Sequence, residues 1–125
     1  MPSENPTGAK PWLKKSLLES NLEALLNEHF PGQFKYNGDY SQRVLIGRKI
    51  PDFVSGNGKK IVIEAAGCFY HHCPICCPGK AYGHKNDSKQ VVKYYKLHGY
   101  DCLIIWEHEL KDKLLIQRLK NFIFI

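Results

Sequence analysis

Residues 50–66 read IPDFVSGNGKKIVIEAA, and this stretch decides the fold. Two extended segments, residues 50–54 and 60–65, flank the turn Ser55-Gly56-Asn57-Gly58. Short β-favouring runs separated by Gly and Asn are typical of a β-hairpin. Residues 61–63 are apolar on both faces, which predicts a central strand covered from both sides.

A carboxylate lies on each arm of this predicted hairpin. Asp52 closes the first segment, and Glu64 interrupts the otherwise apolar second segment. Because burying an unpaired carboxylate is costly, such a residue normally has a cation or a hydrogen-bond partner. The alternative is an exposed strand end with Glu64 paired to a lysine. Two converging carboxylates would bind Mg2+ or Mn2+, and such an ion lowers the pKa of the water that attacks a phosphodiester.

A cluster of sulfur and imidazole groups follows at once, because residues 67–77 read GCFYHHCPICC. Cys73 and Cys76 form a C-x-x-C knuckle, which lets both thiolates reach one tetrahedral zinc ion. Cys68 can supply a third ligand. Cys77, His71 and His72 compete for the same ion, with Cys76 preferred over Cys77 on spacing. The alternative for the whole cluster is a set of free cysteines or a redox pair.

The rest of the chain predicts an α/β domain with a mixed central sheet flanked by helices, in the order α-β-β-β-α-β-α. Residues 1–10 are polar and read as a flexible N-terminal arm, and residues 11–125 read as one domain. We expect helices at 12–29, 86–97 and 110–122, and strands at 34–36, 50–54, 60–65 and 102–106. Residues 43–46 fit either a strand or a loop. The 102–106 strand is expected to run parallel to the 60–65 strand, and Val91, Val92, Tyr94 and Tyr95 to face inward.

Composition narrows the class of protein. The chain has 125 residues with a formal net charge of +6, which favours a polyanionic partner. Four of the five cysteines lie within residues 68–77, unlike the spread of a secreted disulfide scaffold. We see no secretory leader and no apolar run long enough to span a membrane. We therefore expect an intracellular protein, in the cytoplasm or nucleoid, or in a host cell if it is viral.

Several of these motifs together resemble a known family. Pro51-Asp52 followed by Glu64-Ala65-Ala66 resembles the PD-(D/E)xK nuclease signature of the restriction-endonuclease-like fold. Within that superfamily, the strings at 67–72, 106–108 and 118–123 resemble the very short patch repair endonucleases, which nick DNA at mismatches; homing endonucleases with a related catalytic domain are also similar. The likeness covers about residues 12–123.

The resemblance implies roles for individual residues. Asp52 matches the metal-binding aspartate of the family and His71 a catalytic histidine. Glu19 matches a helical glutamate, with an exposed helix position as its alternative and Glu23 as a rival. Asp87 is nearest to a further aspartate of the family. The resemblance also implies a structural zinc ion, whose last ligand would be His108 after Cys68, Cys73 and Cys76.

The chain also departs from the family pattern. Ala66 stands where the superfamily has a lysine, and Glu64 stands where the repair enzymes have no acidic residue. The expected site is therefore a hybrid, with Asp52 and Glu64 on Mg2+ or Mn2+ and His71 moving a proton in place of the lysine. This leaves two functions open: a magnesium-dependent DNA endonuclease, and a catalytically inactive zinc-stabilised DNA-binding protein.

Double-stranded DNA is the expected partner. The residues expected to contact it are Phe69, Tyr70, Lys60, Lys85 and Lys89; the two aromatic residues would insert between base pairs or, alternatively, pack against the zinc. A nickase would act as a monomer, and a double-strand cutter as a homodimer.

Overall fold

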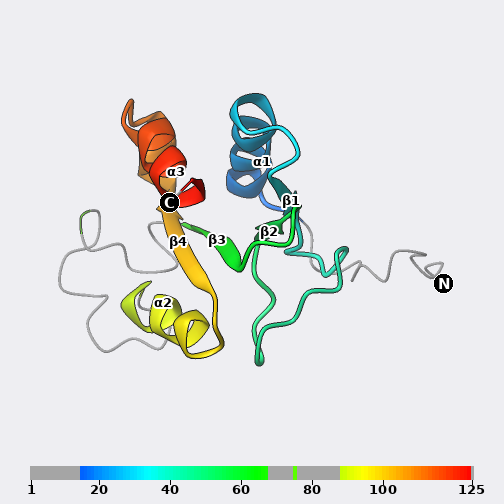
Figure 1. Ribbon diagram of the computed structural model, residues 1–125. Coiled ribbons are helices and arrows are strands. Elements are labelled where there is room, and N and C mark those ends of the chain that lie inside the picture. Colours follow the sequence, from blue (N-terminus) through cyan, green and yellow to red (C-terminus); the bar gives the residue numbers. More distant parts are fainter. Residues whose placement is uncertain (1–14, 68–74, 76–87, 125) are drawn as a thin grey trace, which may run out of the picture.

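The computed structural model describes residues 15–67, 75 and 88–124 (Figure 1). Its elements are α1 (Leu17–His29), β1 (Phe34–Tyr36), β2 (Phe53–Ser55), β3 (Ile61–Ala66), α2 (Ser88–Leu97), β4 (Asp101–Trp106), the 3-10 helix η1 (Glu107–Lys111) and α3 (Leu115–Ile123). The predicted α/β class and the order α-β-β-β-α-β-α are confirmed. The predicted N-terminal arm and the predicted zinc loop lie outside the described residues.

The four strands form one mixed sheet in the order β1-β2-β3-β4. β1 with β2, and β2 with β3, pair antiparallel, so the predicted hairpin is present. β3 and β4 pair parallel along six positions, from Ile61 opposite Asp101 to Ala66 opposite Trp106. The predicted parallel pairing is therefore confirmed, and β3 lies between two neighbours.

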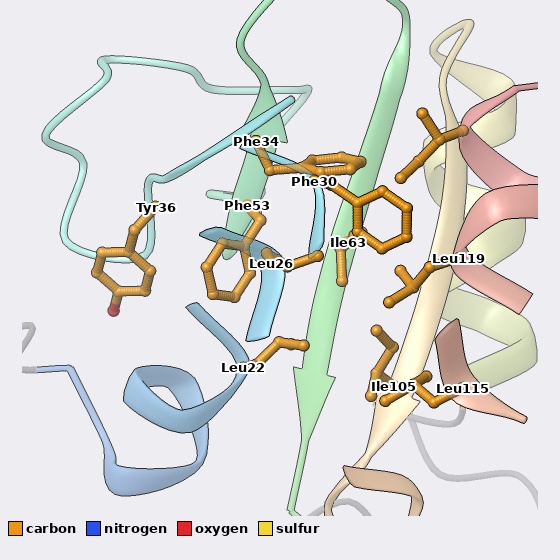
Figure 2. Packing of buried hydrophobic residues seen from close by; sticks show 11 residues of the cluster. Leu22, Leu26, Phe30, Phe34, Tyr36, Phe53, Ile63, Ile105, Leu115 and Leu119 are labelled. Carbon is orange, nitrogen blue, oxygen red and sulfur yellow. The ribbon is translucent and has the colours of Figure 1, made fainter. Parts of the chain in front are cut away.

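Helices cover both faces of the sheet. α1 and α3 lie on one side and α2 on the other (Figure 1). The larger core fills the α1 and α3 side, where leucines of the helices pack against aromatic and branched residues of the strands (Figure 2). The labelled members are Leu22, Leu26, Phe30, Phe34, Tyr36, Phe53, Ile63, Ile105, Leu115 and Leu119. A smaller cluster of Ile46, Val54, Val62 and Tyr95 fills the α2 side.

α1 begins at Leu17, five residues after the predicted start. Ser16 is the N-cap: its hydroxyl accepts from the backbone N–H of Glu19 at 3.1 Å, and a Glu19 carboxylate oxygen accepts from the backbone N–H of Ser16 at 2.8 Å. This reciprocal capping box satisfies two N–H groups that lack helical partners. The helical spacing of Leu13 with Leu17 and Leu18 hid the Ser-x-x-Glu cap, so the predicted start was wrong.

Two other predictions need correction on the C-terminal side. The expected single helix over 110–122 is interrupted, because Asp112 follows η1 in an extended conformation and its carboxylate accepts from the backbone N–H of Leu114 at 2.9 Å. Val92, expected to face inward, is 37% exposed. Tyr95 is the one buried residue of α2. Residues 43–46 form a loop, in which Arg43 has a φ of 58° and Ile46 forms a single β-bridge to Lys49.

Candidate functional site

The structure brings Asp52 and Glu64 together at one end of the sheet. Phe53 pairs with Ile63, so the residues before and after them lie side by side. The backbone N–H of Asp52 donates to Oε1 of Glu64 at 3.3 Å, and the backbone N–H of Ala65 donates to Oδ2 of Asp52 at 2.9 Å. The hairpin thus places the two carboxylates within one site.

Burial raises the pKa of both carboxylates, and the charge of Glu64 adds to the shift of Asp52. Burial, then the charge of Glu64, then that of Glu19 raise the pKa of Asp52 well above its usual value. Burial raises the pKa of Glu64 to about 6, against the hydrogen bond from Tyr95 and the positive charge of Lys49, which lower it. Two carboxylates this close resist carrying full charge together unless a cation joins them.

The pair opens into a cavity of about 480 Å³. Its described lining is the first turn of α1 with the ends of β2, β3 and β4: Ser16, Leu17, Leu18, Glu19, Asp52, Glu64, Ala65, Gly67 and Glu107. Four of these residues carry carboxylates, and no described residue of the lining is a Lys or Arg. The cavity is therefore chemically suited to a cation.

Glu19 contributes to this cavity from the first turn of α1. Its charge raises the pKa of Asp52 and, after burial, that of the Tyr36 hydroxyl, so it lies within electrostatic reach of both groups. The capping bond to Ser16 occupies one of its oxygens. Within residues 15–67, 75 and 88–124, no three Asp, Glu, His or Cys side chains already stand as a metal-binding group.

The rival glutamate lies elsewhere. Glu23 forms an ion pair with Lys15 and is not among the described residues that line the cavity. Of the two glutamates weighed from the sequence, Glu19 is the one that faces Asp52.

Tyr95 and Asn37, to which no role in the site was assigned from the sequence, form hydrogen bonds to Glu64 and Asp52. Tyr95 is fully buried in α2, and its hydroxyl donates to Oε1 of Glu64 at 2.7 Å. Burial and the charge of Glu64 raise the pKa of this hydroxyl, so it remains a donor. Its inward orientation follows from helical spacing, whereas its carboxylate partner becomes visible only once α2 is packed on β3.

Asn37 supports the other carboxylate. It is fully buried, and its side-chain amide donates to the carbonyls of Val44 at 2.9 Å and Pro51 at 3.1 Å, while its backbone N–H donates to the carbonyl of Asp52 at 2.7 Å. In the sequence Asn37 reads only as part of a turn. No local signal announces that its amide ties β1 to the segment that carries Asp52.

Glu107 is the fourth acidic residue of the cavity, and it was not assigned a role from the sequence. It follows Trp106, which pairs with Ala66 at the end of the parallel strands. Because the carboxyl ends of parallel strands meet at one edge of the sheet, a Glu directly after β4 could have been placed near Glu64. That was the signal available.

Of the four predicted zinc ligands, the structure describes His108. Cys68, Cys73 and Cys76, with His71 and Asp87, lie outside the described residues. His108 lies in η1, two residues beyond the end of β4, on the wall of a hollow shared with Asn21, Leu25 and Lys111. The zinc site stays a prediction.

The predicted DNA-contacting residues that the structure describes are not among the described residues that line the carboxylate cavity. Lys60 precedes β3, at the opposite end of that strand from Ala65, in a hollow shared with Lys59 and Tyr100. Lys89 lines a separate open hollow, together with Lys93, Lys96 and Arg118. Phe69, Tyr70 and Lys85 lie outside the described residues.

Comparisons of the chain with protein-family models, curated proteins and solved structures gave no match. No helix among residues 15–67 and 88–124 has the length and apolar character needed to cross a bilayer. What the site can do therefore has to be argued from its own geometry.

Proposed function

We propose that this protein is a metal-dependent DNA endonuclease, which hydrolyses phosphodiester bonds with a divalent ion held at Asp52 and Glu64. The observation that carries the proposal is the meeting of these two carboxylates in a cavity lined by Glu19 and Glu107 as well. Oxygen ligands of this kind suit Mg2+ or Mn2+. Such an ion lowers the pKa of bound water and neutralises charge on phosphate oxygens.

Each residue of the proposed site has its own role in holding the ion or moving a proton. Asp52 and Glu64 would hold the ion in their deprotonated forms, because a ligating carboxylate must be deprotonated. Their backbone contacts keep the carboxylates oriented, and Tyr95 supports Glu64 from the opposite side. His71 remains our proposal for proton transfer.

Ala66 bears on how the site would work without the lysine of the PD-(D/E)xK signature. Ala66 is buried and packs against Trp106, so this position contributes packing and no charge. The resemblance to the very short patch repair endonucleases and the restriction-endonuclease-like fold remains part of the proposal. So does a structural zinc ion on Cys68, Cys73, Cys76 and His108.

The proposed substrate class rests on charge. The chain carries a formal net charge of +6, while the described lining of the cavity is acidic. Lys and Arg side chains elsewhere on the protein would therefore attract a polyanion. A divalent ion bound in the cavity would let it accept a phosphate. Double-stranded DNA is the polyanion we propose.

The second candidate function is a zinc-stabilised DNA-binding protein without catalytic activity. The observation that favours it is the lack of a basic side chain. Position 66 is an alanine, and the described lining of the cavity holds no Lys or Arg. With no Lys or Arg in the described lining to contact the phosphate, the transition state of hydrolysis would be stabilised less.

Incubation with supercoiled plasmid in Mg2+ or Mn2+ tests the proposal. We expect nicked or linear product from the wild-type protein and a loss of at least about 100-fold in rate for Asp52→Ala and Glu64→Ala, because each removes a metal ligand. Glu23→Ala removes a carboxylate outside the cavity and serves as the matched control. Cleavage that survives both ligand substitutions would refute the proposed site. DNA binding without cleavage under any divalent ion would favour the second candidate.

A further inference from the structure

Tyr95 makes the contact that stands out behind the carboxylate pair. Its hydroxyl donates to Oε1 of Glu64 at 2.7 Å, and the same oxygen accepts from the backbone N–H of Asp52 at 3.3 Å. One oxygen of Glu64 is therefore held by donors from two directions, one from α2 and one from the segment before β2. A carboxylate held in this way has a fixed rotation about its own axis.

Packing alone does not account for the hydroxyl of the buried Tyr95. Its ring is fully buried against Ile46, Val54 and Val62, on the face of the sheet opposite the larger core. A phenylalanine would supply the same apolar contact. A buried tyrosine hydroxyl needs a partner, and here that partner is an acidic group of the cavity.

The neighbouring tyrosine provides a contrast within the same helix. The Tyr94 hydroxyl accepts from the backbone N–H of Arg48 at 2.7 Å, and its ring lies beside His98 with centroids 4.6 Å apart. Tyr94 therefore contacts the 43–49 loop and is not among the residues that line the carboxylate cavity. The two adjacent hydroxyls serve different parts of the protein.

We propose that Tyr95 is a positioning residue for metal binding, which orients the Glu64 carboxylate from the α2 side of the sheet. This inference rests on the proposed function, since it assumes that Glu64 is a metal ligand. Groups that hydrogen-bond to a ligating carboxylate fix its orientation and commonly change metal affinity when they are removed. The Tyr95 hydroxyl would act through Glu64 without contacting the ion or the substrate.

The test compares Tyr95→Phe with Tyr94→Phe in the whole 125-residue chain, purified without chelator. Each variant loses one hydroxyl from the same helix, but only the first loses a bond to a carboxylate. Mn2+ binding is measured by calorimetry at constant pH, and thermal unfolding without added Mn2+ reports on the fold. We expect Tyr95→Phe to weaken Mn2+ binding by about 10- to 100-fold and Tyr94→Phe to change it by less than about 3-fold.

The possible outcomes separate this inference from the proposed function. A wild-type protein that binds no Mn2+ refutes the metal site, and the inference falls with it. Equal Mn2+ affinity in wild type and Tyr95→Phe overturns the inference alone and leaves the metal site standing. Equal weakening in both tyrosine variants also overturns it, because that result reports general damage to α2.

If Tyr95→Phe does not fold, a second variant decides. Ala substitution at Val91, a partly buried residue packed against the same cluster, loosens α2 without touching the hydroxyl. Under the inference, this variant loses thermal stability and keeps the Mn2+ affinity of the wild type within about 3-fold. A loss of 10-fold or more would show that packing of α2, and not the Tyr95 hydroxyl, sets the affinity, and it would overturn the inference.

Discussion

The Glu64 side chain is hydrogen-bonded to the main chain of Asp52, and the Asp52 side chain is hydrogen-bonded to the main chain next to Glu64. The backbone N–H of Asp52 donates to the Glu64 side chain at 3.3 Å, and the residue after Glu64 donates to the Asp52 side chain at 2.9 Å. Neither carboxylate can turn away without losing a hydrogen bond in a partly buried site. The pair is therefore kept close despite its like charges.

The pKa shifts predict how stability depends on pH in magnesium-free buffer. The pKa of Glu64 rises from 4.5 to about 6 on folding, and that of Asp52 rises as well, so the folded protein binds protons more tightly than the unfolded chain. The stabilisation from Glu64 is present below its unfolded pKa of 4.5 and is lost as pH rises through about 6.

This dependence is measured by urea unfolding of wild type and Glu64→Gln between pH 4.5 and 7.5. Relative to wild type, Glu64→Gln should gain about 1–2 kcal/mol more stability at pH 7.5 than at pH 4.5, since its amide does not titrate. A constant difference across this range would show that Glu64 titrates normally in the folded protein.

A divalent ion should stabilise the wild-type protein and leave Asp52→Asn unaffected. Without the ion, Asp52→Asn should unfold at a higher temperature than wild type, because it relieves the repulsion with Glu64 while an amide oxygen still accepts from Ala65. With Mn2+ at about 100 times its dissociation constant, wild type should gain about 2.7 kcal/mol.

Differential scanning fluorimetry over a Mn2+ titration measures both effects, with Glu23→Gln as the matched control. The control should respond to Mn2+ as wild type does. An equal Mn2+ response in Asp52→Asn would remove this residue from the metal site.

Replacing Asn37 by Ala should destabilise the protein by about 2–4 kcal/mol. The substitution leaves the buried carbonyl of Pro51 and the backbone groups of Val44 without their partners. Asn57→Ala is the control, because Asn57 lies exposed in the hairpin turn and should cost about 1 kcal/mol or less. Chemical denaturation of the two variants gives the comparison, and similar losses would mean that the Asn37 network adds little.

One zinc ion per chain is expected in protein purified without chelator. Cys73→Ser should abolish zinc binding, and His108→Ala should lower the zinc content, because each removes one of four predicted ligands. His29→Ala, which alters an exposed histidine in the last turn of α1, should retain the metal. Elemental analysis of the three variants decides, and a full zinc complement in His108→Ala would exclude this residue as a ligand.

The hairpin and the sheet could be predicted because their signals are local. Two apolar runs around Gly56 and Gly58, and a third at residues 102–106, suffice to predict β2, β3 and β4. The helix ends could not be placed as well. The start of α1 depends on the side chain of Ser16, and the break before α3 depends on that of Asp112, both of which compete with a longer helical pattern.

The candidate site was predictable to a similar extent. Asp52 directly precedes β2 and Glu64 lies in the adjacent β3, so their meeting follows from the hairpin register. Glu107 and Tyr95 reach the site through β4 and α2, which pack against β3 from distant parts of the sequence. The place of Glu107 directly after β4 was a usable signal, whereas the bond between Tyr95 and Glu64 appears only once α2 is packed on β3.

The capping box of α1 has a practical consequence for anyone who expresses this protein. Glu19 both closes the first turn of the helix and faces Asp52, so a truncation that removes Ser16 frays that turn and disturbs the acidic cavity. The last turn of α3 lies at the other end of the sheet, where the Lys59 ammonium donates to the carbonyl of Ile123 at 2.7 Å. An affinity tag at the C-terminus would therefore lie away from the acidic cavity, whereas deletions that reach Ile123 would remove a buried core residue.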